Sequence, residues 1–371
     1  MKKQGMDLTL LVTTILLVAI GIMMVFSASY SYAMSNMGDG LYFLKRILQW
    51  AGIGLCVMIL FSFIPYGIWR KLSVPLLIIS LSGLVIVLSS LGTEINYARR
   101  WIQVAGFSVM PSELVKFSLV IFMAASLEKN KIHLNYFWRG VMPYLILAGG
   151  IFFLIYKQPD FSTALIIVTL IIMMMFIGGI RISHFMVLLV TGVTAVAGFL
   201  SYILLTGQGY KTRRLVAYLD PWADPSDAGL QTIQSLLAIG TGGLAGKGIG
   251  RSIQKHLHLP EPHNDFIFSI IAEELGFLGG AFGILLFALY IWRCTRIAIN
   301  APDGFGCLLA SGVAGLVGVQ VLINIGVATS LLPVTGIPLP FISFGGNALV
   351  ILMGLTGILL NVSKMSINHG G

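Results

Sequence analysis

The sequence predicts an all-α membrane protein in which about ten helices cross the bilayer and one large loop lies outside it. Hydrophobic residues make up 57% of the 371 positions, and the mean hydropathy is +0.93. Only 14 acids occur beside 43 glycines, a composition far from that of soluble domains. Apolar runs of about 20 residues, enough to cross a hydrocarbon layer of about 30 Å, recur along the chain. In lipid such runs must be helical, because no water is present to satisfy their backbone amides.

The first apolar run, 8–28, follows two lysines and resembles a secretory signal, with the small residues SAS at 27–29. It is longer than the apolar core of a typical signal, and equally apolar runs follow it, so we interpret it as an uncleaved first span. The break at KQPD, 157–160, predicts a tight turn between the fifth and sixth spans. The other nine runs lie at 47–64, 73–91, 109–127, 141–156, 161–180, 184–205, 266–292, 306–330 and 344–362.

Ten spans place both termini on one side, and the distribution of Lys and Arg indicates which side. The loops on the side of the termini carry eleven such residues and the short loops on the other side carry five, which predicts cytoplasmic termini. The eleven are Lys2, Lys3, Arg70, Lys71, Lys129, Lys131, Arg139, Arg181, Arg293, Arg296 and Lys364, and the five are Lys45, Arg46, Arg99, Arg100 and Lys157.

The one long loop, about 206–264, is then extracytoplasmic. Loops of this length are usually functional or disordered, and its apolar stretch LQTIQSLLAIG, 230–240, predicts an amphipathic helix on the membrane surface. We find no inverted repeat, no heptads and no separate soluble domain, so residues 1–371 are expected to form a single transmembrane domain. The three cysteines have no regular spacing, which argues against both a disulfide framework and a metal site.

Within this loop, IGTGGLAGKGIG, 239–250, resembles a phosphate-binding loop but fails the standard patterns. Thr241 stands where the first glycine is needed, Gly248 stands where Ser or Thr is needed, and no strand precedes the stretch. A flexible turn between surface helices is the favoured interpretation of the glycines. Lys247 and Arg251 still place positive charge near the membrane surface, where a lipid pyrophosphate would lie.

The stretch PSELVK, 111–116, predicts a helix start that carries a pair of opposite charges. Pro111 suits the first helical turn, and Glu113 and Lys116 share a face. Each charge would cost about 3 kcal/mol at the middle of the bilayer, so such pairs usually face a bundle interior or a wet cavity. We favour a cavity-lining role over a purely local pair. Asp160, before the sixth span, fits an N-cap, and capping alone could explain it.

The stretch LPEPHNDFIFSIIAEELG, 259–276, gathers acids at the start of an apolar helix. Asn264 or Asp265 can cap that helix. Asp265 also stands where a general base for an outer-leaflet substrate could lie. Glu261 is expected only to position the loop. His263 is more typical of a surface histidine than of a ligand, because no second ligand stands at metal-site spacing.

Glu273 and Glu274 follow Asp265 by eight and nine residues. In a continuous helix they lie about 12–13 Å deeper than Asp265. At that depth they need partners such as Lys116 or must stay protonated. We expect them to hold the bundle together.

Eight motifs occur along the chain, namely RRWIQ (99–103), PSELVK (111–116), QPDFSTA (158–164), YKTRRLVAYLDP (210–221), QSLLAIGTGGLAGKGIGRS (234–252), LPEPHNDFIF (259–268), EELG (273–276) and GIPLPFISFGGNAL (336–349). In this order and spacing they resemble the SEDS family, the FtsW/RodA/SpoVE group of polytopic peptidoglycan glycosyltransferases, nearly from end to end. Three positions depart from the usual family pattern: Asn264 where Thr is common, Met110 where Gln is usual and Ser162 where Gly is usual. These changes affect fine geometry and leave the reactive groups in place.

The resemblance implies polymerisation of lipid II at the outer face of the bacterial cytoplasmic membrane. An acceptor 4-hydroxyl attacks the anomeric carbon of a polyprenyl-pyrophosphate-linked glycan, which needs a base at the hydroxyl and positive charge at the pyrophosphate. Asp265 matches the family's proposed catalytic aspartate. Trp101, Glu113, Lys116 and Arg214 match other implicated positions, with Lys116 and Arg214 assigned to pyrophosphate or cavity charge and Glu113 to orienting Lys116. Lys247, Arg251 and His263 complete the expected substrate-binding set.

The resemblance also implies partners and leaves alternatives open. A divalent cation, Mg or Mn, could share the pyrophosphate role, although no ligand set in the sequence indicates one. The expected partners are lipid II, a class B penicillin-binding protein with transpeptidase activity, other cell-wall synthesis or divisome proteins and membrane lipid, with no nucleic acid. The run GIGRSIQK into LPEPHNDF is closer to the FtsW and SpoVE branch, which favours division or sporulation over elongation. A lipid II flippase and a non-catalytic scaffold are the alternative functions.

Overall fold

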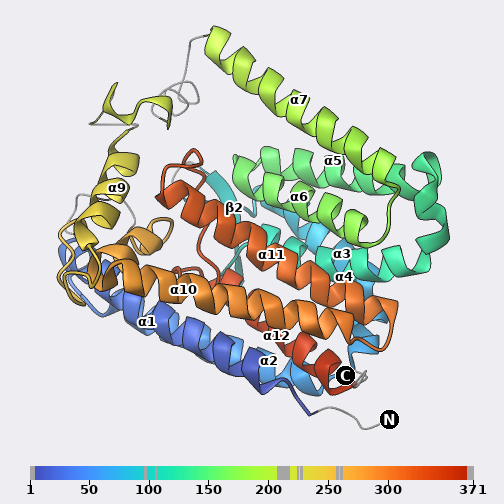
Figure 1. Ribbon diagram of the computed structural model, residues 1–371, viewed down its shortest axis with the longest axis horizontal. Helices are drawn as coiled ribbons and strands as arrows, with labels where there is room; N and C mark the ends of the chain where they lie inside the picture. The colour runs from blue at the N-terminus through green and yellow to red at the C-terminus, as the bar shows by residue number, and fades with distance from the viewer. Residues whose placement is uncertain are drawn as a thin grey trace.

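The computed structural model describes residues 5–95, 98–104, 107–206, 218–223, 225, 229–255, 259 and 262–365. Ten long helices in this part of the chain correspond in order to the ten apolar runs (Figure 1). Seven of the helical segments are long and apolar enough to span a membrane by length and composition. The predicted all-α polytopic class is therefore confirmed. The ten helices are α1 (Leu8–Met37), α2 (Tyr42–Phe63), α3 (Tyr66–Val87), α4 (Pro111–Lys129), α5 (Met142–Tyr156), α6 (Phe161–Ile177), α7 (Ile182–Thr206), α10 (Ile267–Ile299), α11 (Gly304–Ala328) and α12 (Gly346–Met365).

Several helices extend beyond the apolar runs that predicted them. Helix α1 continues to Met37 and ends where Gly38 takes a left-handed conformation, with φ 69°, a common way to end a helix. Helix α3 begins at Tyr66, directly after Pro65, seven residues before the predicted run. Hydrophobicity locates the part of a helix that suits lipid, whereas caps and prolines determine where the helix ends.

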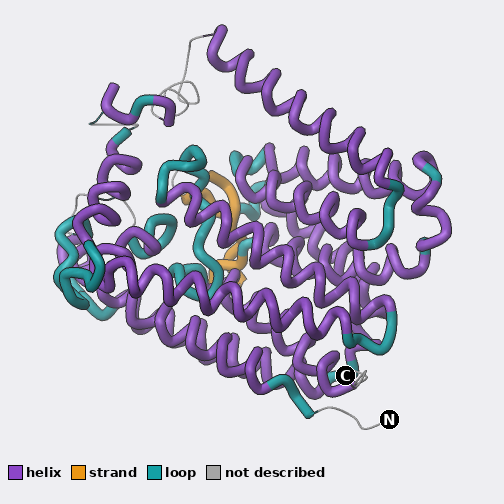
Figure 2. Tube along the Cα trace, viewed as in Figure 1, coloured by secondary structure: helices purple, strands orange, loops and turns teal. Residues whose placement is uncertain are grey.

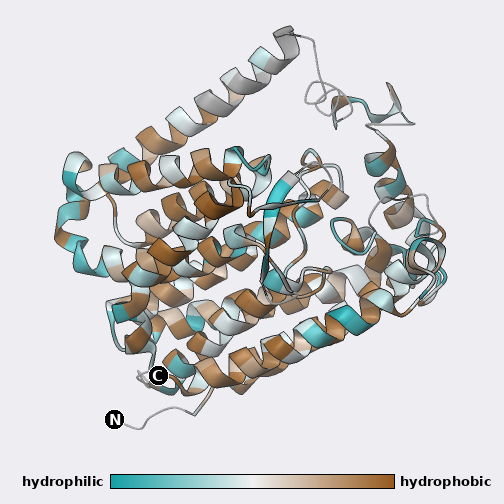
Figure 3. Cartoon of the chain, turned by 180° about the vertical axis from the view of Figure 1, so that it is seen from behind, coloured by the Kyte–Doolittle hydropathy of each residue, from teal (hydrophilic) through white to brown (hydrophobic). Residues whose placement is uncertain are grey.

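The first and last described helices meet at one end of the bundle. The backbone N–H of Asp7 donates to the Ser363 hydroxyl at 3.1 Å, and the Arg293 guanidinium pairs with the Asp7 carboxylate at 2.6 Å. These contacts join the start of α1 to the ends of α10 and α12, and Figure 1 shows these helix ends together at one end of the bundle. Helix α9 (Leu230–Gly242) lies at the opposite end. The long helices are mostly apolar along their length (Figure 3).

A three-stranded antiparallel sheet precedes α4, which the sequence did not predict. Its strands are β1 (Thr93–Ile95), β2 (Ala98–Val104) and β3 (Phe107–Val109), in the order β1-β2-β3 (Figure 2). Thr93 pairs with Trp101, and Ile102 pairs with Val109. The strands are short and belong to a connection between spans, so hydropathy carries no signal for them. Short helical turns complete the fold: η1 (Lys131–Asn135), η2 (Phe137–Val141) and η3 (Pro221–Ala223).

Helix α10 is broken near its start. Gly276 has φ 69° and ψ −167°, which is not helical. The ring of Phe268 lies 3.6 Å from the position a Cβ would take on Gly280, although twelve residues of straight helix would separate these positions by about 18 Å. The segment 267–275 therefore folds back along the rest of α10. The predicted depth of Glu273 and Glu274 is wrong, because it assumed one continuous helix.

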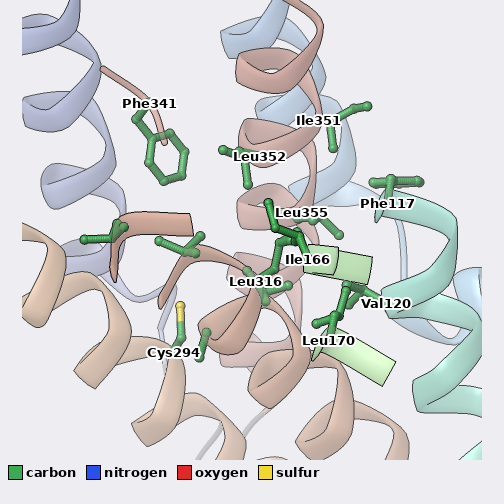
Figure 4. Packing of buried hydrophobic residues seen from close by; sticks show 14 of the residues in the cluster. Phe117, Val120, Ile166, Leu170, Cys294, Leu316, Phe341, Ile351, Leu352 and Leu355 are labelled. Carbon is green, nitrogen blue, oxygen red and sulfur yellow. The ribbon is translucent and has the colours of Figure 1, made fainter. Parts of the chain in front are cut away.

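The interior of the bundle is tightly packed with apolar side chains. Val120 of α4, Leu170 of α6, Leu316 of α11 and Leu355 of α12 converge in one cluster (Figure 4). Each of these four side chains is at most 1% exposed. These four helices therefore share one apolar interior.

Candidate active site

The backbone leading to Asp265 is held by three consecutive hydrogen bonds. The carbonyl of His263 accepts from the Phe344 N–H at 3.0 Å. The carbonyl of Asn264 accepts from the Ser343 hydroxyl at 2.6 Å, and the carbonyl of Asp265 accepts from the Asn324 amide at 2.8 Å. All three donors come from the end of α11 or from the connection to α12. Asp265 is thus fixed at the backbone while its side chain remains half-buried.

The same connection approaches the Asp265 carboxylate. Gly336 lies so near that a Cβ on it would be 3.5 Å from Oδ2 of Asp265. Gly336 has φ +75°, a conformation that L side chains rarely adopt. The Asn324 amide, whose residue is 1% exposed, also donates to the carbonyl of Ile337 at 2.7 Å. A single buried amide therefore joins Asp265, two residues before α10, to the α11–α12 connection.

Capping does not account for Asp265. The sequence predicted that Asn264 or Asp265 would cap this helix, but the N-cap is Phe266 and no side chain forms a cap hydrogen bond. The prediction is wrong because the chain forms a turn through residue 266 before α10 begins, so the N-cap position falls on Phe266. By contrast, Asp160 does cap α6, since its carboxylate accepts from the Thr163 N–H at 3.2 Å.

The connection between α11 and α12 also contacts the sheet and α6. The Ser162 hydroxyl donates to the carbonyl of Thr335 at 2.5 Å. The Asn347 amide donates to the carbonyl of Ser108, in β3, at 2.8 Å. Residues from four parts of the chain thus converge on the connection that holds Asp265.

Arg100 attaches the sheet to the turn between α5 and α6. Its guanidinium donates to the carbonyl of Gln158 at 3.1 Å and to the carbonyl of Pro159. It also lies 3.9 Å from the Asp160 carboxylate. Trp101 follows in β2 and is half-buried. Arg100 therefore holds the strand that bears Trp101 against the turn between α5 and α6.

Glu113 and Lys116 form a buried ion pair in the first turns of α4. Lys116 Nζ lies 2.5 Å from Glu113 Oε1, and the two residues are 2% and 6% exposed. The predicted shared face and the helix start at Pro111 are confirmed. Helix α4 begins two residues after β3, so the pair follows the sheet closely in the chain. The contact supports orientation of Lys116 by Glu113, while a cavity-lining role stays a prediction.

His263 is enclosed by aromatic rings. Its ring centroid lies 4.3 Å from that of Phe43 and 5.7 Å from those of Tyr32 and Phe344. The residue is 3% exposed, so the expectation of a surface histidine is wrong. Burial lowers the pKa of His263 from 6.5 to about 4, because desolvation disfavours the charged ring. The neutral ring packs as an aromatic side chain, and a substrate would reach it only if its neighbours moved.

The basic residues predicted to bind pyrophosphate have different surroundings. Lys247 Nζ donates to Glu273 Oε1 at 2.7 Å and to the Thr241 hydroxyl at 2.8 Å. Arg251 is exposed, and its guanidinium forms no ion pair within the described part of the chain. Arg214 lies outside the described residues, as does Glu261.

The two glutamates at the helix break have partners other than the predicted Lys116. Glu273 pairs with Lys247 and also accepts from the Ser252 hydroxyl at 2.5 Å. Glu274 pairs with Lys255 Nζ at 2.8 Å. Lys116 is instead occupied by Glu113. The prediction of Lys116 as a partner assumed a deep position that the glutamates do not have, whereas their expected structural role agrees with these contacts.

The described residues do not fit a metal ion by themselves. In residues 5–365, apart from the gaps given above, no group of three or more His, Cys, Asp and Glu side chains could hold one.

Sequence reasoning missed several residues that build the site. Asn324, Ser343 and Arg100 act through backbone carbonyls, and such contacts leave no local pattern. A signal existed for Asn324, because a buried amide inside an apolar span is costly unless it is satisfied. The run GIPLPFISFGGNAL served only to support the resemblance, although it provides much of the site's framework.

Comparisons with known proteins agree with this architecture. Residues 7–368 match the family model of the cell cycle proteins FtsW, RodA and SpoVE. The chain is 43% identical to stage V sporulation protein E of Bacillus subtilis (strain 168), with 98% of this chain and 99% of the relative covered. It is 41% identical to a probable peptidoglycan glycosyltransferase FtsW of Geobacter sp. (strain M18), with 98% of both chains covered.

Two solved structures share the fold. A chain from work on polymerization and crosslinking by a peptidoglycan synthase complex aligns with a TM-score of 0.78 and 29% identity, covering 97% of this chain and 98% of that one. The rod shape determining protein RodA of Thermus thermophilus aligns with a TM-score of 0.71 and 29% identity, covering 97% of both chains.

Proposed function

Because the chain belongs to the FtsW/RodA/SpoVE family of cell cycle proteins, we propose that it is a peptidoglycan glycosyltransferase that polymerises lipid II. The observation that carries this proposal is the fixed backbone of Asp265, whose carbonyl and the two before it each accept a hydrogen bond. General-base catalysis needs a carboxylate held in one place. The half-buried carboxylate of Asp265, just before α10, meets that need.

In the proposed reaction, the acceptor 4-hydroxyl attacks the anomeric carbon of the donor. The bond from that carbon to the pyrophosphate oxygen breaks, a glycosidic bond forms with inversion, and the hydroxyl proton passes to Asp265. Lys116, oriented by Glu113, is proposed to place positive charge toward the pyrophosphate. Trp101, Arg214, Arg251, Lys247 and His263 remain proposed contributors to substrate binding. Any Mg or Mn ion would take most of its ligands from pyrophosphate and water.

We also propose the orientation and the partner. The bias in Lys and Arg supports cytoplasmic termini, which places Asp265 at the outer face of the cytoplasmic membrane. The structural relative comes from a complex concerned with polymerization and crosslinking, which supports a transpeptidase partner of the class B penicillin-binding type. The similarity to SpoVE and FtsW proteins supports a role in sporulation or division.

A flippase is less well supported. A transport pathway needs polar groups or water through the core, but the cluster around Val120, Leu170 and Leu355 is apolar and fully buried. A non-catalytic scaffold would not require three hydrogen bonds to hold the backbone of one half-buried aspartate.

The function is tested with purified protein, labelled lipid II and the cognate penicillin-binding partner. The proposal predicts a ladder of glycan strands when the products are resolved by length. Absence of a ladder even with the partner, together with movement of lipid II across vesicles that contain the protein, would overturn it and support the flippase.

A further inference from the structure

The segment that follows Asp265 is a short, separate helix with its own attachments. Residues 267–275 precede the break at Gly276 and form nine residues of helix. At the first turn, the Ser269 hydroxyl lies 2.6 Å from the Ser235 hydroxyl of α9. Ser235 also donates to the carbonyl of Ala328, at the end of α11, at 2.7 Å. Because Asp265 lies two residues before this segment, the contacts that hold the segment also affect the position of Asp265.

The glycine-rich loop after α9 pairs with the break through its backbone. The N–H groups of Lys247 and Gly248 donate to the carbonyls of Glu273 and Glu274, at 3.0 and 2.9 Å. On the other side of the break, the Phe277 N–H donates to the carbonyl of Gly243 at 2.8 Å. These bonds satisfy groups that a helix end leaves without partners.

The close approach requires a glycine in the loop. Gly246 has φ +78°, and a Cβ on it would lie 2.2 Å from the carbonyl oxygen of Glu274. The predicted flexible turn is instead a packed element. Gly242, just before the loop, makes a similar approach, because a Cβ on it would lie 1.9 Å from the carbonyl oxygen of Ala272.

A charged latch adds to these backbone contacts. Glu274 is 0% exposed and Lys255 is 4% exposed, and their side chains form an ion pair at 2.8 Å. The Ser27 hydroxyl of α1 donates to the Glu274 carboxylate at 2.7 Å and accepts from Lys255 Nζ at 3.1 Å. The Ser252 N–H also donates to Glu274 at 3.3 Å. Both charges are thus satisfied within the protein, which leaves Lys255 little capacity for a ligand.

We propose that Ser27, Lys255 and Glu274 form a latch that positions Asp265 by fixing the segment 267–275 against α1; this rests on the proposed function of Asp265. The three are positioning residues. Asp265 lies at one end of the segment and Glu274 at the other, so a shift at the latch moves the base. A displacement of about 1 Å at a reacting group can lower turnover about 100-fold.

The experiment compares Lys255→Met, Glu274→Gln and the double variant with wild type. It measures the unfolding temperature, and kcat and KM for lipid II at a temperature where every variant is folded. Removing one partner leaves a buried charge alone, whereas removing both leaves none. Each single variant should lose at least about tenfold in kcat, with KM changed less than about twofold. The double variant should regain unfolding temperature and part of the lost kcat.

The matched control is Lys45→Met. Lys45 pairs with Asp39 at the same 2.8 Å distance, but the two side chains are 63% and 44% exposed, so this variant should behave as wild type. If Lys255→Met raises KM and the folded double variant does not recover, Lys255 contacts substrate and the latch is rejected. It is also rejected if the unfolding temperature falls while kcat is unchanged. Polymerisation by wild type in the same experiment tests the proposed function separately.

Discussion

At Gly336, the backbone conformation disfavours a side chain, and the nearest neighbour is the carboxylate of Asp265. We expect Gly336→Ala to lower stability by about 1 kcal/mol, since L residues avoid the left-handed region, which φ +75° occupies. The added methyl group would make an ordinary contact, 3.5 Å from Asp265 Oδ2, but relief of the unfavourable φ would shift the backbone beside that carboxylate, so kcat should fall about tenfold. Glycan ladders and thermal unfolding measure the two effects.

Gly345→Ala is the control for this prediction. Gly345 belongs to the same connection, and a Cβ there would meet only ordinary contact, at 3.6 Å from Ala348. If both alanine variants retain full turnover, the approach of Gly336 to Asp265 has no catalytic consequence.

The buried His263 makes stability depend on pH. Its pKa in the folded protein is about 4, against 6.5 ordinarily. Above pH 6.5 the ring is neutral in both states and no stability is lost. As the pH falls from 6.5 to 4, the unfolded chain binds a proton that the folded protein excludes, which costs about 3 kcal/mol of stability.

His263→Phe keeps an aromatic ring in the same cage and removes this titration. The unfolding temperature of wild type should therefore fall more than that of the variant between pH 6.5 and 4. Equal pH profiles for the two proteins would contradict the buried, neutral state of His263.

Residue-level predictions from sequence were reliable where the contact is local. Glu113 and Lys116 stand three apart on one helix, and that spacing alone places them together. Asp160 precedes its helix and caps it. The contacts that hold Asp265 join residues 59 to 81 positions apart, and a lone Asn or Ser gives no indication of such a partner.

At the scale of elements, the position of the sheet depends on the two hydrogen bonds that the Arg100 guanidinium donates to the α5–α6 turn. A guanidinium can donate to two carbonyls at once, and lysine cannot reproduce that geometry. We expect Arg100→Lys to weaken the attachment of β2 and to lower the free energy of unfolding by about 1–3 kcal/mol. Because Trp101 lies in the same strand, its displacement should lower kcat/KM about tenfold. Unfolding and steady-state kinetics measure these changes.

Arg99→Lys provides the comparison. Arg99 is the neighbouring residue, pairs with Glu94 at 3.1 Å and is 53% exposed, so its conservative replacement should have little effect. An Arg100→Lys protein that matches Arg99→Lys in both measurements would show that the Arg100 hydrogen bonds do not position the sheet.

The helices themselves could be located from hydropathy, but the break in α10 could not. Residues 266–292 are apolar apart from a few residues such as Glu273 and Glu274, and a glycine in a span is common. The break exists because a distant loop pairs with it, and that pairing leaves no local pattern. The same fact explains why the glycine loop was interpreted as flexible and why the partners of Glu273 and Glu274 were predicted wrongly.

At the scale of the whole molecule, the candidate site is built mainly from the connections between helices, whereas the packed core is built mainly from the helices. Ion pairs and glycines with positive φ occur in the connections around Asp265 and at the break in α10, while the cluster of buried residues in Figure 4 is apolar. Composition and periodicity predicted the number and order of the helices because lipid requires them. The arrangement of the connections depends on long-range contacts, so there only the family resemblance indicated which residues would matter.

The central claim, that Asp265 is the base of a polymerase, is tested most directly by Asp265→Asn. The amide has nearly the same shape but cannot take the proton from the acceptor hydroxyl, so kcat should fall at least about 100-fold. The measurement is the glycan ladder formed from labelled lipid II with the partner present, after wild-type unfolding temperature and membrane insertion have been verified for the variant. A ladder that vanishes supports the assignment, and a folded Asp265→Asn protein that polymerises at the wild-type rate would contradict it.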